Sequence, residues 1–282
     1  MSDLEALKLQ VEWGADEALE DAPVDRFRAA LAQDSPKPAV PAGDGGDGPG
    51  SPPFLGGGRS ERPRLTLAQR AQQEAAGAAN LDELRAAVAG FGGCPLRDTA
   101  SHLIFAEGDS RAKLILIGEP PSADDDRSGM AFAGPAGEYL DRMLAAINLV
   151  RTQLLLTPLI PWRPPGNRPP SPTELAVCLP FLHRLIALVA PCRLLIMGLL
   201  PSRSLLPRST SRRRARGEWI DVPVPGTSLV MPALPTFSAI ELMKAPENRR
   251  LAWDDLRLLR RTLEEDGSPD TGPTQDTITL PK

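Results

Sequence analysis

The side chains with the clearest chemical potential lie in the segment PLIPWRPPGNRPP, residues 158–170, where two arginines and an asparagine stand among prolines. Proline fixes φ and removes a backbone donor, so this segment is predicted to be a stiff, exposed loop rather than a helix or a central strand. Arg163, Asn167 and Arg168 in this loop can bind phosphate oxygens, as can Arg214 and Arg216 in the later segment RSTSRRRARG. A solvated loop that binds nothing is the other interpretation of such an arginine run.

A loop of this kind can carry a site only if strands and helices hold it in place, and the apolar pattern supplies such elements. Short apolar runs predict four buried strands, at residues 113–118, 153–160, 192–198 and 228–237. Helical patterns are found at residues 65–79, 80–91, 137–147, 171–189 and 246–265.

Helix starts are also visible in the sequence. Asn80 is predicted to cap one helix, and Ser171 another, in which Glu174 completes a capping box. Strands that alternate with helices favour an α/β fold with a mostly parallel four-stranded sheet and helices on both faces. Ligands in such sheets bind outside the carboxyl ends of the strands.

The flanks of the chain differ in composition from this core. Residues 1–31 are predicted to form an acidic helical segment, residues 32–64 a disordered linker rich in proline and glycine, and residues 267–282 a disordered tail. The globular domain therefore spans residues 65–266. The net charge of -4 combines an excess of acidic over basic groups in residues 1–90 with a slight basic excess in residues 91–266.

Some classes of protein are disfavoured by composition. No apolar run reaches the roughly 18 residues of a membrane span and no secretory leader opens the chain, so a cytoplasmic location, in a bacterial cytosol or nucleoid, is expected. Three cysteines provide no disulfide framework.

Five motifs in a fixed order resemble those of the family 4 uracil-DNA glycosylases, the iron-sulfur type of the uracil-DNA glycosylase superfamily. They are GEPPS at residues 118–122, GMAFAGPAG at 129–137, RPPGNR at 163–168, Arg216-Gly217, and WDDL at 253–256. The resemblance covers about residues 91–265. It implies a three-layer α/β/α sandwich that flips uracil out of single- or double-stranded DNA and hydrolyses its glycosidic bond in base excision repair, with the protein expected to act as a monomer.

The resemblance also implies roles for individual residues. Glu119 matches the acidic residue that positions or activates water, and Phe132 matches the phenylalanine that stacks on uracil. Gly118 allows the base to come close to the backbone, and an acidic pair of the family is partly matched at Asp124 to Asp126, where a solvated loop is the simpler interpretation.

Two positions depart from the family pattern. Pro158 stands where the family has the asparagine that reads the uracil edge, and Ser238 stands where it has a histidine that donates to uracil O2. A serine hydroxyl can still donate, and Thr157 lies next to the lost amide. The expected consequence is attenuated activity.

The metal site of the family is also incomplete. Of the four cysteine thiolates that hold its 4Fe-4S cluster, only Cys94 and Cys178 are present, with Phe91 and Trp162 at the other two places. A cubane cluster needs four ligands, so no cluster is expected unless His183 or Cys192 substitutes. Phe91 and Trp162 are predicted to fill the vacated volume.

Three functions are therefore open. The first is a diverged uracil-DNA glycosylase with Glu119 and Ser238 as catalytic residues and Phe132, Gly118 and Thr157 around the base. The second is an inactive module that keeps the fold and binds DNA or a protein partner. The third and weakest is a small-molecule site at a glycine-rich turn, because neither a dinucleotide nor a Walker motif is present.

Overall fold

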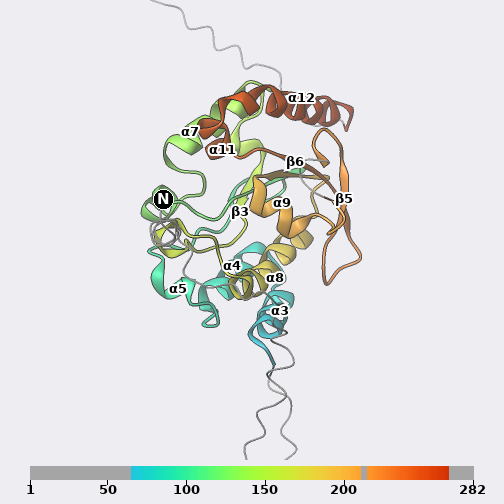
Figure 1. The fold of residues 1–282 in the computed structure, drawn as a ribbon. Helices are drawn as coiled ribbons and strands as arrows, with labels where there is room; N and C mark the ends of the chain where they lie inside the picture. Colours follow the sequence, from blue (N-terminus) through green and yellow to red (C-terminus); the bar gives the residue numbers. More distant parts are fainter. Residues whose placement is uncertain (1–64, 211–214, 267–282) are drawn as a thin grey trace, which may run out of the picture. The chain divides into compact units, whose positions relative to one another are not determined.

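The computed structural model describes residues 65–210 and 215–266 (Figure 1). The predicted acidic segment at 1–31, the linker at 32–64 and the tail at 267–282 lie outside the described residues, as does Arg214. The predictions for them stay predictions.

A mixed sheet forms the centre of the described chain. Its strands lie in the order β1-β3-β2-β4-β6-β5. They span Glu107–Gly108 (β1), Leu114–Gly118 (β2), Leu155–Pro158 (β3), Arg193–Met197 (β4), Ile220–Pro223 (β5) and Val230–Thr236 (β6). β3, β2, β4 and β6 are parallel neighbours, while β1 and β5 are antiparallel strands at the two edges.

The four predicted strands are thus confirmed as the parallel centre, and the two edge strands were missed. β1 and β5 have 2 and 4 residues, too few to give a recognisable apolar alternation. The segment 158–170 was predicted to be a loop outside the central strands. Its first residue, Pro158, is instead the last residue of β3, an interior strand. A proline is tolerated at this strand end, where Leu159 N already donates to Gly118 O at 2.9 Å and continues the pairing.

Alternation within the buried strands divides the core in two. Leu114 and Leu116 of β2 face one apolar cluster, while Ile115 and Ile117 face the other. Successive side chains of a strand point to opposite faces, so a strand that is apolar throughout must be covered on both sides.

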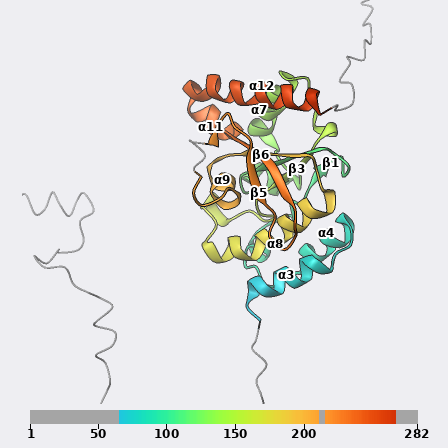
Figure 2. The same cartoon turned by 90° about the vertical axis from the view of Figure 1, so that its right-hand side faces the viewer.

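Helices cover both faces of the sheet (Figure 2). The first layer contains α3 (Leu67–Gly77), α4 (Leu81–Gly90), α8 (Pro172–Val189) and α9 (Leu199–Leu205). The second contains α7 (Gly134–Ala145), α11 (Ala239–Lys244) and α12 (Arg249–Glu265). The α/β sandwich with helices on both faces is confirmed.

α8 begins as predicted, with Ser171 and Glu174 in a reciprocal capping box, and Asn80 caps α4. By length and mean hydropathy, 1.4, α8 could cross a membrane. Here it packs against α3 and α4 and buries seven residues, among them Cys178 and Phe181, as the core helix of a globular domain also does.

Candidate active site

A single pocket lies at the carboxyl edge of the sheet and collects four of the predicted site residues. Its walls include the last residues of three parallel strands, which are Gly118, Pro158 and Met197. Glu119 and Phe132, from the segment after β2, and Ser238, which follows β6, line the same pocket. Its cavity volume is about 50 Å³. The position agrees with the rule that open parallel sheets bind ligands at this edge.

Phe132 is held in this pocket by an unusual backbone. Its φ is 54°, in the left-handed region that residues other than glycine seldom adopt. Its ring lies so close to Gly118 that a Cβ there would overlap the ring, and a Cβ on Gly137 would overlap the Phe132 carbonyl oxygen. Both glycines are therefore required by Phe132, and Gly118 acts through the aromatic ring rather than by leaving space for a ligand.

Three charged side chains hold the backbone around Phe132. Arg151 Nη2 donates to the carbonyl of Phe132 at 2.7 Å. Glu107 accepts from the Ala131 N–H at 2.6 Å, and Asp125 accepts from the Ala133 N–H at 2.6 Å. Glu107 and Arg151 come from other parts of the chain, so sequence reasoning missed them, and nothing local to either residue would have revealed them.

Glu119 has its carboxylate fixed at the start of α9. Oε1 accepts a hydrogen bond from the Leu200 N–H at 3.3 Å. Gly198, whose φ is 113°, lies against this carboxylate, and a side chain there would overlap it. A carboxylate oriented in this way at a pocket wall can hold and polarise a water molecule.

Ser238 is buried and caps α11. Its Oγ accepts from the Glu241 N–H at 3.2 Å, and Glu241 in turn accepts from the Ser238 N–H at 2.8 Å. A hydroxyl has one donor and two acceptor sites, so accepting this bond leaves its O–H able to donate to a ligand in the pocket. The signal for the cap, Ser-x-x-Glu, was present in the sequence at residues 238–241.

The remaining polar groups of the pocket are committed to the protein. Ser122 and Asp125 form the capping box of α6 (Ala123–Ser128), with Asp125 N–H donating to Ser122 Oγ at 3.2 Å. Pro158 offers no side-chain donor or acceptor, and Ile104, Met197 and Ala239 make the other walls apolar. Glu119 and Ser238 are the carboxylate and hydroxyl of the pocket wall whose chemistry suits a ligand.

Thr157 does not line this pocket, contrary to its predicted place beside the base. It is buried, and its hydroxyl donates to the Phe105 carbonyl at 3.1 Å. Side chains alternate along a strand, so Thr157 points away from the pocket that its neighbour Pro158 reaches.

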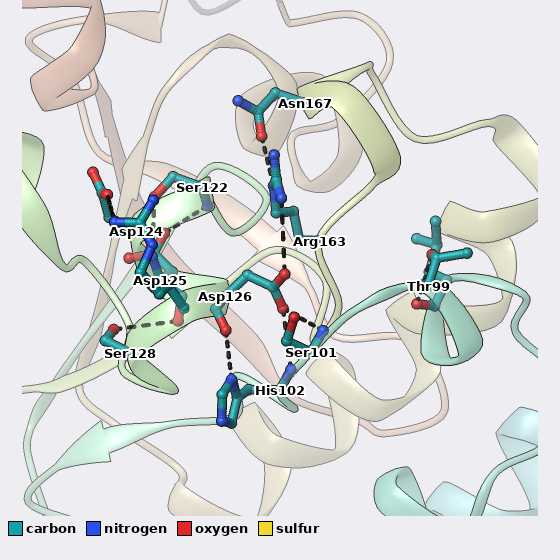
Figure 3. Close-up of polar contacts among 12 residues, drawn as sticks. Thr99, Ser101, His102, Ser122, Asp124, Asp125, Asp126, Ser128, Arg163 and Asn167 are labelled. Carbon is teal, nitrogen blue, oxygen red and sulfur yellow. Dashed lines mark hydrogen bonds and ion pairs between the residues drawn. The ribbon is translucent and has the colours of Figure 1, made fainter.

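The sequence favoured a solvated loop for the acidic run Asp124 to Asp126, and this expectation was wrong, because the run lies in helix α6. Asp125 and Asp126 are 8% and 5% exposed. Asp126 accepts from the Ser101 and His102 N–H groups at 2.8 and 3.1 Å, and Figure 3 shows Arg163 between Asp126 and Asn167. These carboxylates order the pocket wall.

The proline loop is exposed only in part. Residues 158–162 and Pro164 are buried, whereas residues 165–169 are exposed. Arg163 donates from Nε to Asn167 Oδ1 at 2.8 Å within the loop and lies 3.8 Å from Asp126 of α6, so its predicted phosphate contact competes with contacts inside the protein (Figure 3).

Arg168 and Arg216 also have internal partners. Arg168 binds both oxygens of Glu174, at 2.7 and 2.9 Å, and this bidentate pair lowers the pKa of Glu174 to about 2. Arg216 is 15% exposed and binds Asp255 at 3.2 Å. Burial raises the pKa of that Asp255 carboxyl against the opposing effects of Thr236 and Arg216.

A wider groove opens from the pocket and contains cations that sequence reasoning missed. It has a volume of about 560 Å³ and shares Glu119, Pro120, Ser122 and Ile240 with the pocket. Arg203 of α9 and Lys244 of α11 line it and are exposed. Within the described part of the chain, neither side chain makes an ion pair, in contrast to Arg163, Arg168 and Arg216.

Cys94 and Cys178 lie together in the core on the α8 side of the sheet, with Sγ atoms 3.9 Å apart. Phe91 and Trp162, at 1% and 3% exposure, belong to the same apolar cluster, and Phe91 packs edge-on against Phe181 at a ring distance of 5.4 Å. Among the described residues, no group of three or more Cys, His, Asp or Glu side chains could hold a metal. The donor set does not fit a 4Fe-4S cluster, which needs four ligands.

Comparison with known proteins agrees with the family resemblance of the sequence motifs. The sequence model of the uracil DNA glycosylase superfamily matches residues 105–257. Type-4 uracil-DNA glycosylases are similar to this chain: that of Pyrobaculum aerophilum is 30% identical over 125 residues, which is 44% of this chain and 64% of that protein. That of Saccharolobus solfataricus is 28% identical over 189 residues, 65% of this chain and 87% of that protein. That of Thermotoga maritima is 27% identical over 177 residues, 62% of this chain and 90% of that protein.

Proposed function

Because this chain belongs to the uracil DNA glycosylase superfamily, we propose that it hydrolyses the N-glycosidic bond of uracil in DNA, as a step of base excision repair. The observation that carries the proposal is the convergence of Glu119, Phe132 and Ser238 on one pocket at the carboxyl edge of the parallel strands. All three come from one chain, so the proposed acting unit is a monomer. The proposed location is the bacterial cytosol or nucleoid, where the chain meets DNA.

The chemistry follows from these positions. A uracil base must leave the stack to reach the pocket, and stacking on the Phe132 ring offsets part of that cost. Water held by the Glu119 carboxylate attacks C1′ of the sugar and gives up a proton to that carboxylate. The bond between C1′ and N1 breaks with its electron pair moving into the uracil ring. The Ser238 O–H then stabilises the negative charge on the uracil carbonyl oxygen by donating to it.

The same pocket favours a slow reaction. Removal of one preorganised donor typically lowers the rate by about 10²- to 10³-fold, and here a proline replaces the base-reading amide and a serine replaces the histidine. Ser238 cannot carry the positive charge of an imidazole. Base recognition is left mainly to stacking and to shape.

A second function is favoured by the apolar character of the same pocket. With Pro158 at the base edge and a serine, Ser238, in place of the imidazole donor, the second function is DNA binding without turnover. A partner-binding module of this kind would keep the groove while losing the reaction.

The groove beside the pocket is the proposed path of the DNA strand. Arg203 of α9 and Lys244 of α11 make no ion pair with residues 65–210 or 215–266, and their positive charges suit phosphates that flank the extruded base. Arg163, Arg168 and Arg216 are assigned to holding the loops instead, since each already has an internal acidic partner.

The test is single-turnover release of uracil from a single-stranded oligonucleotide that contains one uracil, with protein in excess. Glu119→Gln keeps the shape of the side chain and should lower the rate by about 10²-fold or more. Glu247→Gln, at an exposed position outside the pocket, is the matched control and should leave the rate unchanged. Equal rates in all three proteins would contradict the role of Glu119.

DNA binding is tested separately with the double variant Arg203→Ala/Lys244→Ala. The slope of log affinity against log salt should fall by about 1.4, because roughly 0.7 is contributed by each phosphate contact in single strands. Arg85→Ala/Arg257→Ala removes the same charge from exposed positions outside the groove and should keep the slope. No uracil release together with salt-sensitive binding would favour the inactive module, and absence of both would reject the proposal.

A further inference from the structure

Two thiols in the core have no part in the proposed reaction. Cys94 lies in the short connection between α4 and α5 (Leu96–Thr99), and Cys178 lies in α8, 84 positions further along the chain. Their Sγ atoms are 3.9 Å apart, and the two side chains are 2% and 1% exposed. These sulfur atoms bring the connection after α4 into contact with α8, and in residues 65–210 and 215–266 no third Cys, His, Asp or Glu joins them to form a metal-binding group.

The surroundings of the pair make the two sulfur atoms unequal. The hydrogen bond from Cys178 is the largest effect on Cys94 and lowers the pKa of its thiol to about 7. The pKa of the Cys178 thiol is raised, because it donates this hydrogen bond to Cys94 and lies in an apolar environment. Because Cys94 is next to the exposed Pro95 while Cys178 lies deeper beside an internal cavity, we assign Cys94 as the nucleophile and Cys178 as the resolving thiol.

Access to the pair is from the side of Cys94. Pro95, which follows it, is exposed and Gly93, which precedes it, is partly exposed, so Cys94 lies beneath the surface of a short loop. Cys178 lies deeper, beside a small cavity of about 20 Å³ that is also lined by Val88 and Phe181. A small oxidant that reaches the loop meets the thiolate first.

We propose that Cys94 and Cys178 form a site of oxidation, at which a hydroperoxide such as hydrogen peroxide converts the two thiols to a disulfide. The Cys94 thiolate attacks one peroxide oxygen and the O–O bond breaks, giving a sulfenic acid and, after protonation, one water. The Cys178 sulfur then attacks the Cys94 sulfur, displaces hydroxide and loses its proton, giving the disulfide and a second water. Two thiols are oxidised by two electrons and one peroxide is reduced to two waters.

The bond would tie the connection after α4 to the central core helix. Closing a chain loop of this size restricts the unfolded state, so the oxidised protein should melt at a temperature about 5–15 °C above that of the reduced protein. The inference does not depend on the proposed function, because neither sulfur atom lines the pocket or the groove.

The experiment uses the full chain with Cys192→Ser, since Cys192 is exposed and would react on its own account. The protein is treated with hydrogen peroxide at a few equivalents, and peptides are mapped without reduction. The expected product is one peptide pair joined through Cys94 and Cys178, with a mass about 2 Da below the sum of the reduced peptides and reversal by a dithiol. The melting temperature is measured before and after treatment.

Two further variants make the result decisive. Cys94→Ser and Cys178→Ser, each in the same background, should give no joined peptide and no rise in melting temperature on oxidation. Sulfinic or sulfonic acid at Cys94 without a joined peptide would overturn the proposal. So would a soft metal that elemental analysis finds bound to the purified protein and that both variants lose.

Discussion

At the scale of single residues, Phe132 illustrates how a site can depend on amino acids that touch no ligand. Its left-handed backbone is stabilised by Arg151, which binds the Phe132 carbonyl, and by two glycines whose missing side chains leave room for it. A φ of this sign costs energy in any residue other than glycine. The surrounding contacts offset that cost, and the ring is held against the pocket wall.

Gly118→Ala should therefore act on the site through Phe132. The new methyl group would overlap Cε1 and Cζ of the ring and force it out of place, at an expected cost of about 1–3 kcal/mol in the free energy of unfolding. Uracil release should fall along with stability. Urea titration and the single-turnover assay measure the two effects.

Gly77→Ala is the control for this substitution. Gly77 has nothing within 4 Å of an added Cβ and ends a helix, so its replacement should leave both stability and uracil release nearly unchanged. If Gly118→Ala left both stability and uracil release unchanged, the position of the Phe132 ring would not depend on this glycine.

At the scale of elements, the proline loop and the start of α8 form one unit. Ser171 and Glu174 cap the helix, and Arg168 from the loop binds the same Glu174 carboxylate. One buried carboxylate thus orders the helix start and the end of the loop together. Because Arg168 is used in this way, the loop is better suited to shaping the groove than to binding phosphate.

The ion pair between Arg168 and Glu174 predicts how the stability of the folded protein depends on pH. The pKa of Glu174 is lowered to about 2 in the folded protein from an ordinary value of 4.5, so its contribution to stability is complete above pH 4.5. It is lost as the pH falls through 2, where the folded protein must also take up the proton.

Arg168→Met should remove most of this contribution. At neutral pH the variant should be less stable than the original protein, by a modest amount because the arginine is exposed and its charge is screened by solvent. The difference between the variant and the original protein should shrink between pH 4.5 and pH 2. A difference that stays constant over this range in acid-dependent urea titrations would show that the ion pair is not its origin.

At the scale of the whole molecule, the domain has a packed apolar core where the related family is expected to hold a cluster. Phe91 and Trp162 are buried with Cys94 and Cys178 in one cluster, which extends through α3, α4 and α8 to the sheet. A metal cluster joins distant segments by covalent bonds, whereas here burial of apolar surface joins them.

Phe91→Ala should therefore destabilise the domain by about 3–5 kcal/mol, the usual cost of removing a buried aromatic side chain. Leu67→Ala, at a position 42% exposed, is the control and should cost less than about 1 kcal/mol. Urea denaturation of both variants measures the difference. A small effect at Phe91 would mean that the helices α3 and α4 contribute little to the stability of the whole.

Much of this arrangement was determined by the sequence itself. Continuous apolar runs required strands covered on both faces, and Ser-x-x-Glu at residues 171–174 specified the start of α8, because both signals are local and act over a few residues. The motif order around Glu119 and Phe132 was likewise sufficient to predict the family and two of the residues that meet in the pocket.

Tertiary structure alone decided which charges are available. Arg163, Arg168 and Arg216 looked like phosphate ligands in the sequence, yet each has an acidic partner, and those of Arg163 and Arg216 come from segments distant in the chain. Arg203 and Lys244 carried no sequence signal and line the groove without an ion pair in the described residues. The reason is physical: a charge is satisfied or left uncommitted by neighbours in space, and those neighbours are set by packing at long range.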